Sequence, residues 1–312
     1  MKMHVLLFLS IFVISCTPTT IPRVLDNRLP QSISVAQKQI VAVLSGHQNI
    51  PSTTLQLAAR ATIEERAWSR AYLESVLHQI PLTPISQSYR YRNSNPLVDL
   101  LVGPYKGTNL YVVLPATKPT KDCIVLGAHY DTARNCPGAN DNASAIALLY
   151  GVAQKLNSLQ QRSTNVMFVF FDQEEEELIG SKAFVNCLKE QHYNIIAAHT
   201  FDQIGWDSDN DKAFEIELPS PSLKKQYVSV AATHRVPITI TRVNSTDHHS
   251  FREAGYEAVG ITEGYVQGDT SPYKDTEKDI FETVNFDYLT TLTQLVYDVI
   301  KNQIQTPLSH EK

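Results

Sequence analysis

The sequence lacks several features that would each indicate a different class of protein. It has no excess of basic residues, because 27 Lys and Arg stand against 32 Asp and Glu and the net charge is -5. Nucleic-acid binding needs a basic surface, so we expect neither DNA nor RNA as a partner. No Gly/Ser-rich or Pro-rich linker and no internal repeat interrupts the middle of the 312 residues. One large domain is therefore expected rather than two small ones.

Cysteine and long apolar runs are scarce as well. The 4 cysteines in the chain are too few for a disulfide scaffold. Those beyond the N-terminal segment allow at most one internal disulfide and are Cys123, Cys136 and Cys187. The apolar run near the start covers residues 5–14, follows a single Lys2, and is too short to cross a bilayer as a helix. It predicts a signal peptide over residues 1–15.

The end of this segment, Val13-Ile14-Ser15-Cys16, resembles the bacterial lipobox. The resemblance implies that Cys16 is lipidated and that the Pro-, Thr- and Ser-rich residues 16–33 form a tether to a membrane anchor. Because Thr17 follows rather than Asp, the resemblance implies an exported cell-envelope lipoprotein of the outer membrane or periplasm. An ordinary cleaved signal with an incidental cysteine, and hence a secreted protein, is the alternative.

The rest of the chain alternates helical and strand patterns. The spacing of apolar residues predicts helices over residues 34–45, 52–79, 144–156, 180–191, 222–234 and 288–302. Short apolar runs between turn residues predict strands over residues 86–92, 97–102, 109–114, 123–128, 166–171, 195–201, 213–218 and 258–262. This alternation favours an α/β fold: a single domain with a largely parallel, mixed central sheet covered by helices on both faces.

The unbroken apolar run over residues 166–171 is typical of a strand buried on both faces of such a sheet. It ends in Asp172 and the acidic residues 174–177, at the carboxyl end of the strand, where ligands bind in open α/β sheets. Acidic residues also favour the start of a helix, where they meet the positive end of its dipole. This stretch alone therefore does not separate a binding site from a solvated helix start.

Other apolar runs end in the same way. His129 and Asp131 follow one predicted strand, Asp141 lies in the next loop, and Asp202 follows another strand. With Glu174 and Glu175, these residues would meet at one edge of the sheet, where carboxylates without cations repel each other. Considered singly, His129 would be interpreted as a structural histidine rather than a metal ligand, and Asp141 as the N-cap of a helix. Jointly they predict a divalent metal site, in which Asp131 orients the histidine.

Four short motifs together resemble the co-catalytic zinc aminopeptidase family, which includes secreted bacterial leucyl aminopeptidases, glutamate carboxypeptidase and glutaminyl cyclases. They are GAHYDT (127–132), GANDNAS (138–144), FDQEE (171–175) and FDQIG (201–205). The resemblance runs from about residue 109 to residue 302. It implies a zinc exopeptidase domain over residues 34–312 that binds two Zn²⁺ ions. One ion would be held by His129, Asp141 and Asp202, and Asp141 would bridge to a second ion on Glu175.

The resemblance also implies the chemistry. Gly180 follows five residues after Glu175, a spacing that makes Glu174 the general base and leaves Glu176 and Glu177 solvated. Two metal ions would lower the pKa of a shared water and hold it as hydroxide, and Glu174 would carry its proton to the leaving amine. With Asp131 as the second catalytic residue, the expected substrates are peptides with a free N-terminus.

One position departs from the family. The family has a histidine as its fifth ligand, with an aspartate four residues later, whereas here Asp275 stands in the place of the histidine and Asp279 follows. A carboxylate is an acceptable zinc ligand, so Asp275 is expected to replace the histidine directly. The second site would be more anionic and could favour a metal that prefers oxygen. His248, with His249 beside it, is the alternative ligand.

Two other functions are open on the same scaffold. A glutaminyl cyclase would form N-terminal pyroglutamate with one zinc, and a weakened second site would suit it. The short loop between Glu175 and Gly180 and the form of the ANDNAS motif favour the peptidase instead. The third function is a non-catalytic binding module, against which Glu174 and the four unaltered ligand positions argue.

Overall fold

The computed structural model describes residues 29, 32–92, 96–191 and 193–305. The predicted signal peptide and Cys16 lie outside the described residues, as does nearly all of the predicted tether. In the described ranges, no helix combines the length and the apolar character that a membrane span requires. Cys123, Cys136 and Cys187 are all free.

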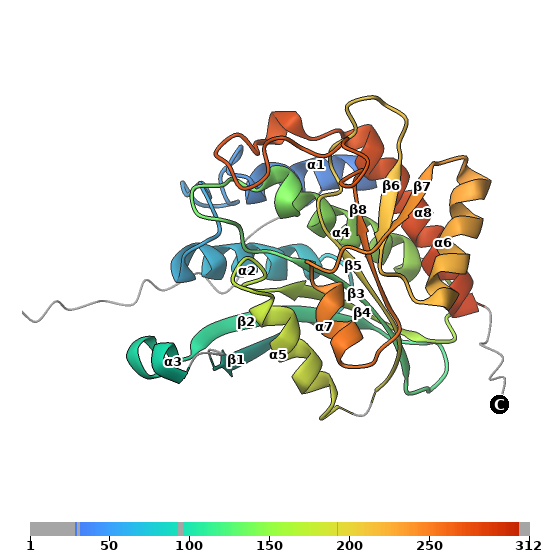
Figure 1. Cartoon of the computed structure of the whole chain (residues 1–312), viewed down its shortest axis with the longest axis horizontal. Helices are drawn as coiled ribbons and strands as arrows, with labels where there is room; N and C mark the ends of the chain where they lie inside the picture. The colour runs from blue at the N-terminus through green and yellow to red at the C-terminus, as the bar shows by residue number, and fades with distance from the viewer. Residues whose placement is uncertain (1–28, 30–31, 93–95, 192, 306–312) are drawn as a thin grey trace, which may run out of the picture.

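One eight-stranded sheet forms the centre of the fold, in the order β1-β2-β4-β3-β5-β8-β6-β7 (Figure 1). Its strands are β1 (Ile85–Tyr91), β2 (Tyr105–Leu114), β3 (Asp122–His129), β4 (Asn165–Phe171), β5 (Asn194–Phe201), β6 (Phe214–Glu217), β7 (Ile238–Thr241) and β8 (Ala258–Thr262). The central strands β4, β3, β5 and β8 are parallel, as are β6 and β7, while β1/β2, β2/β4 and β6/β8 pair antiparallel. The predicted α/β fold with a mixed sheet is confirmed.

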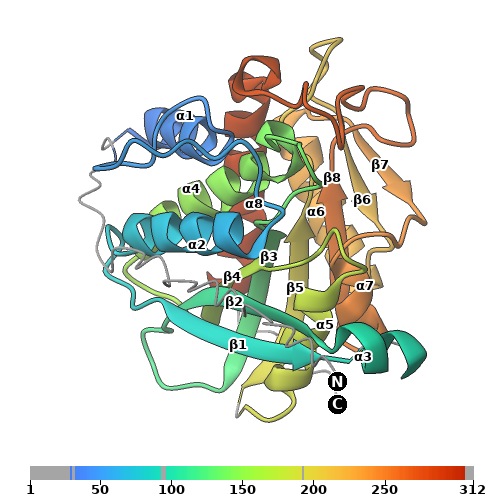
Figure 2. The same cartoon turned by 90° about the vertical axis from the view of Figure 1, so that its left-hand side faces the viewer.

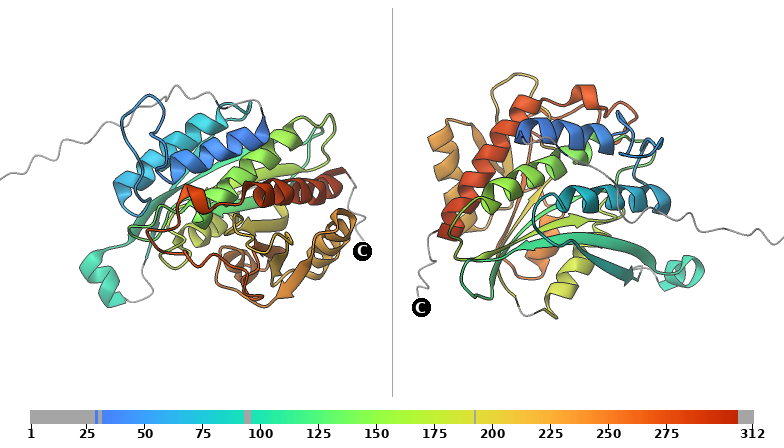
Figure 3. Two further views of the ribbon diagram at one scale, coloured as in Figure 1. Left: turned by 90° about the horizontal axis from the view of Figure 1, so that it is seen from above. Right: turned by 180° about the vertical axis from the view of Figure 1, so that it is seen from behind.

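Helices cover both faces of the sheet (Figures 2 and 3). One face carries α1 (Ile33–Leu44), α2 (Ile63–Leu77), α4 (Ala145–Asn157), α6 (Pro221–His234) and α8 (Phe286–Gln305), and the other carries α5 (Ile179–Leu188) and α7 (His248–Glu253). Strand β4 explains why both layers form, because every residue in it is buried. Phe168 and Phe170 pack into the larger core cluster, whereas Val169 and Phe171 pack into the smaller one on the opposite face.

Two predicted elements were wrong. Residues 97–102, predicted as a strand, belong to the helix α3 (Pro96–Val102), which projects from the body of the protein (Figure 3). Its exposed leucines are Leu97, Leu100 and Leu101, which have the i, i+3, i+4 spacing of a helix. The apolar run was wrongly interpreted as a strand because this helical spacing was overlooked. The helix predicted over residues 52–79 begins only at Ile63. Thr62 caps it, because its side chain accepts from the Glu65 N–H while the Glu65 carboxylate accepts from the Thr62 N–H.

Short elements complete the fold. Strand β7 and helix α7 have only 4 and 6 residues, too few to show a period in the sequence, and neither was predicted. A kinked helical segment, η1 (Ala139–Ser144), leads into α4, and its Asp141–Asn142 peptide bond is cis. A single 3₁₀ turn, η2 (Phe281–Thr283), precedes α8. The segment η1 lies over the carboxyl ends of the parallel strands and carries one of the predicted metal ligands.

Candidate metal centre

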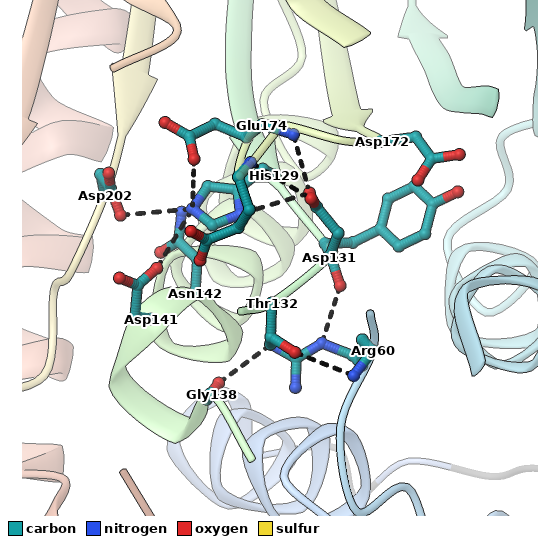
Figure 4. A network of polar contacts seen from close by, with 12 residues as sticks. Arg60, His129, Asp131, Thr132, Gly138, Asp141, Asn142, Asp172, Glu174 and Asp202 are labelled. Atoms are coloured by element: carbon teal, nitrogen blue, oxygen red, sulfur yellow. Dashed lines mark hydrogen bonds and ion pairs between the residues drawn. The ribbon is translucent and has the colours of Figure 1, made fainter. Parts of the chain in front are cut away.

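The carboxyl ends of three adjacent parallel strands bring the predicted side chains together (Figure 4). His129 is the last residue of β3, which pairs with β4 on one side and β5 on the other. Asp202 directly follows β5, and Glu174 and Glu175 lie in the turn after β4. Asp141 reaches the same place from η1. The sheet order thus places the ends of β4, β3 and β5 side by side, as expected for a ligand site in an open α/β sheet.

The first group of possible ligands surrounds the ring of His129, which is only 1% exposed. His129 Nε2 lies 3.2 Å from Asp141 Oδ1 and 3.4 Å from Asp202 Oδ1. Glu174 Oε2 is 4.0 Å from the same nitrogen. One atom each of His129, Asp141 and Asp202 lies within 4.8 Å of the others, so the three could hold one ion. This is the set that the family resemblance implies for the first zinc.

A second group of possible ligands shares Asp141 with the first. One carboxylate oxygen each of Asp141, Glu175 and Asp275 lies within 4.8 Å of the others. Both carboxylate oxygens of Asp141 are buried and have no hydrogen-bond partner. Buried polar atoms are almost always satisfied, so an orphaned carboxylate between two donor groups fits a ligand that faces cations. The nitrogen and oxygen donors are of the type that zinc accepts.

Asp131 connects the histidine to the turn that carries the glutamates. Its Oδ1 lies 3.5 Å from His129 Nδ1 and accepts a hydrogen bond of 3.0 Å from the Glu174 N–H. Its Oδ2 accepts from the Glu175 N–H at 3.2 Å. The carboxylate thus lies beside the ring of His129 and holds the backbone of the turn that carries both glutamates.

Burial and the negative charge of the site shift the pKa values of both glutamates. Burial, together with the nearby Asp141 carboxylate, raises the pKa of Glu175 to about 8. Burial also raises the pKa of Glu174 well above its ordinary value, although His129 opposes that shift. Both shifts express the cost of placing several anions together away from water. A divalent cation would offset this cost and keep the ligands ionised.

Asp275 and His248, the two alternative ligands for the second ion, lie in different parts of the structure. Asp275 lies on the loop before η2 and faces Asp141 and Glu175, within the second group. His248 is fully buried elsewhere, with Nδ1 2.9 Å from Thr246 Oγ1 and Nε2 3.1 Å from the Val243 carbonyl oxygen. Both of its ring nitrogens are engaged, which favours Asp275 as the ligand. The exposed Glu176 and Glu177 have the solvated positions that were predicted for them.

The loop around Asp141 is held by carboxylates that lie behind the site. Asp279 accepts from the Asn140 N–H at 2.8 Å and from the Asp141 N–H at 2.9 Å. The fully buried Glu263 accepts from Asn140 Nδ2 at 2.9 Å.

A steric requirement explains the glycine at position 180. Gly180 allows α5 to approach the end of β4, because a Cβ there would clash with the Asp172 carbonyl oxygen. The Gly180 position in the motif thus has a steric reason.

Sequence reasoning missed two basic residues at this site. Arg60 is 0% exposed and donates to the carbonyl oxygens of Leu44, Tyr130, Pro137 and Gly138 at 2.6 to 3.0 Å. Lys274 places Nζ 3.8 Å from Asp141 Oδ2. Arg60 precedes α2, far along the chain from the motifs, and no local pattern marks it. Lys274 could have been found, since it directly precedes Asp275.

This fold and this site define the superfamily of co-catalytic zinc aminopeptidases and glutaminyl cyclases. Residues 109–300 match peptidase family M28, and the chain belongs to that family. Aminopeptidase YwaD of Bacillus subtilis is 27% identical over 196 residues, which are 58% of this chain and 42% of that protein. The chain thus spans less than half the length of this curated relative.

Solved structures share the fold. BSAP, a zinc aminopeptidase from Bacillus subtilis, superposes with a TM-score of 0.74 at 15% identity and covers 89% of this chain and 97% of its own. The glutaminyl cyclase of Bacteroides thetaiotaomicron gives a TM-score of 0.69 at 19% identity, with 88% and 99% covered. At such identities the likeness concerns the fold, which a peptidase and a cyclase have in common.

Proposed function

We propose that the protein is a metal-dependent aminopeptidase that removes N-terminal residues from peptides. The observation that carries this proposal is Asp141, whose two buried oxygens accept no hydrogen bond and lie between two groups of possible metal ligands. Membership of a peptidase family supports hydrolysis rather than binding alone. A decayed site would not be expected to retain a complete donor set together with Glu174.

Zinc fits the donor set. His129, Asp141 and Asp202 would hold one ion, and Asp141, Glu175 and Asp275 would form the second position. When bound, the metal would polarise the scissile carbonyl and lower the pKa of the attacking water. Asp131 would keep the His129 ring in place, because its carboxylate lies 3.5 Å from Nδ1.

Glu174 would serve as the general base. Its carboxylate is mostly buried, lies 4.0 Å from His129 Nε2 and faces an open hollow of about 520 Å³ that Glu175, Lys274 and Asp275 also line. From there it would take a proton from the attacking water and pass it to the nitrogen of the leaving amine. Its raised pKa suits a group that must both accept and release that proton.

Release of the chromophore from a panel of aminoacyl-nitroanilides tests the activity. We expect release from at least one member of the panel, loss of release after treatment with a chelator, and recovery when zinc is added. The matched N-acetylated compounds should resist cleavage, because they lack the free α-amine. If no member of the panel gives chelator-sensitive release, the assignment is wrong.

A glutaminyl cyclase is the second candidate, favoured by the all-carboxylate second group and by the fold shared with the Bacteroides enzyme. A peptide that begins with Gln separates the two functions. The peptidase would release free glutamine and a shortened peptide, whereas the cyclase would release ammonia and leave a pyroglutamyl peptide of the original length.

We propose further that residues 1–15 are a signal peptide, that Cys16 is lipidated, and that residues 16–33 tether a peptidase domain of residues 34–312. The enzyme would then act in the cell envelope, at the outer membrane or in the periplasm. Cells that express the wild type should incorporate labelled fatty acid into the protein, whereas a Cys16→Ala variant should incorporate none. Equal labelling of both would exclude Cys16 as the lipidation site and leave a secreted protein as the alternative.

A further inference from the structure

We propose that the ammonium group of Lys274 supplies part of the positive charge that a second metal ion would bring. The chain would then bind one divalent ion tightly and a second only weakly. This inference rests on the metal site of the proposed function, and it specifies how many ions that site holds. Its readout is the number of bound ions, which is measured independently of peptidase activity.

The two oxygens of Asp141 face different neighbours. Oδ1 lies 3.2 Å from His129 Nε2, on the side of the first ligand group. Oδ2 lies 3.8 Å from Lys274 Nζ. An Asp141 that bridged two ions would need Oδ2 for the second ion. The ammonium group therefore lies beside the oxygen on which a second ion depends.

With Lys274 in its observed position, a second ion would lie close to this ammonium group. A zinc ion lies about 2.0 to 2.2 Å from a carboxylate oxygen, and Nζ is 3.8 Å from Oδ2, so ion and ammonium would be at most about 6 Å apart. The side chain of Lys274 is 39% exposed, so water screens the repulsion only in part. In the described residues, no lysine or arginine forms an ion pair with Asp141 Oδ1 or with Asp202, the carboxylates of the first position.

The donor set weakens the second position further. The first group offers a histidine nitrogen and two carboxylates, whereas the second, made of Asp141, Glu175 and Asp275, offers carboxylates alone. Zinc binds well to sets that contain imidazole nitrogen, and all-oxygen sets suit harder ions. Lys182 lines the same hollow but donates to the Glu177 carbonyl oxygen at 2.8 Å. Among the described lysines, Lys274 is the one paired with a proposed metal ligand.

Counting bound zinc in the purified full chain tests the proposal. After equilibration with zinc and passage over a desalting column, elemental analysis should find about one ion per wild-type chain. The Lys274→Gln variant should retain a second ion, and titration should show that its second affinity is higher by about 10- to 100-fold, the effect of removing one partly screened like charge.

Two variants show whether charge is the cause. Lys274→Arg keeps the positive charge and should retain the weak second site. Lys278→Gln removes an exposed lysine from the same loop and should bind zinc as the wild type does. Circular dichroism spectra and melting curves would verify that each variant is folded.

Several results would overturn the inference: two tightly held ions in the wild type, no gain in Lys274→Gln over Lys278→Gln, or a gain in Lys274→Arg equal to that in Lys274→Gln. The inference and the proposed function can fail separately. Peptide cleavage by a chain with two tight ions would leave the function standing, whereas one tight ion without cleavage would leave the inference standing.

Discussion

A Glu174→Gln variant is expected to lose about 10²- to 10⁴-fold in kcat and to keep its bound metal. Glutamine has nearly the same shape as glutamate and can still hydrogen-bond, but it cannot accept a proton from water at neutral pH. The backbone N–H of residue 174 would still donate to Asp131 Oδ1, so the turn after β4 should stay in place. Kinetics on a cleaved aminoacyl-nitroanilide and elemental analysis of the same preparation give both quantities.

Glu177→Gln is the matched control for this prediction. It removes a carboxylate from the same acidic run, but the residue is exposed at the edge of the hollow and belongs to neither group of possible ligands. Its kcat should equal that of the wild type. A Glu174→Gln enzyme with nearly full activity would rule out Glu174 as the general base. If that variant instead lost metal, Glu174 would be a ligand, in the group that it can form with His129 and Glu175.

Replacement of Arg60 by methionine is expected to lower the free energy of unfolding by about 3–5 kcal/mol, because several buried carbonyl groups would lose a hydrogen-bond donor. The guanidinium group is completely buried and donates to four carbonyl oxygens, and methionine would remove all four of these hydrogen bonds. Of the four acceptors, Gly138 would keep a second donor, the Ala143 N–H. Two of these acceptors, on Tyr130 and Gly138, belong to the segments that carry His129 and Asp141. Zinc affinity should therefore fall together with stability. Urea unfolding with and without zinc measures both effects.

Arg90→Met is the control for the loss of an arginine. Arg90 is exposed on β1, so its replacement should change the free energy of unfolding by no more than about 0.5 kcal/mol. If Arg60→Met cost less than about 1 kcal/mol, the four carbonyl groups would have found water or other donors, and the anchoring role of Arg60 would be wrong.

The central strands could be predicted because burial on both faces of the sheet requires an unbroken run of apolar residues, which is visible in the sequence. Strand β4 is apolar at every position from Val166 to Phe171, because both of its faces are covered, and it ends where the polar site begins. Helix α3 could not be predicted in the same way. Its three leucines are exposed, so the apolar run over residues 97–102 does not reflect burial, and its period was misread. Neither β7 nor α7 is long enough to show a period.

The sequence by itself determined which side chains could bind metal and that they follow parallel strands. His129, Glu175 and Asp202 each follow an apolar run, and parallel strands align their carboxyl ends. Only the tertiary structure decided which oxygen of Asp141 faces the histidine and which faces Lys274. It also decided that Arg60 anchors the segments around the site. Such contacts join residues far apart in the chain, through loops whose conformation depends on packing, and packing leaves no periodic pattern in the sequence.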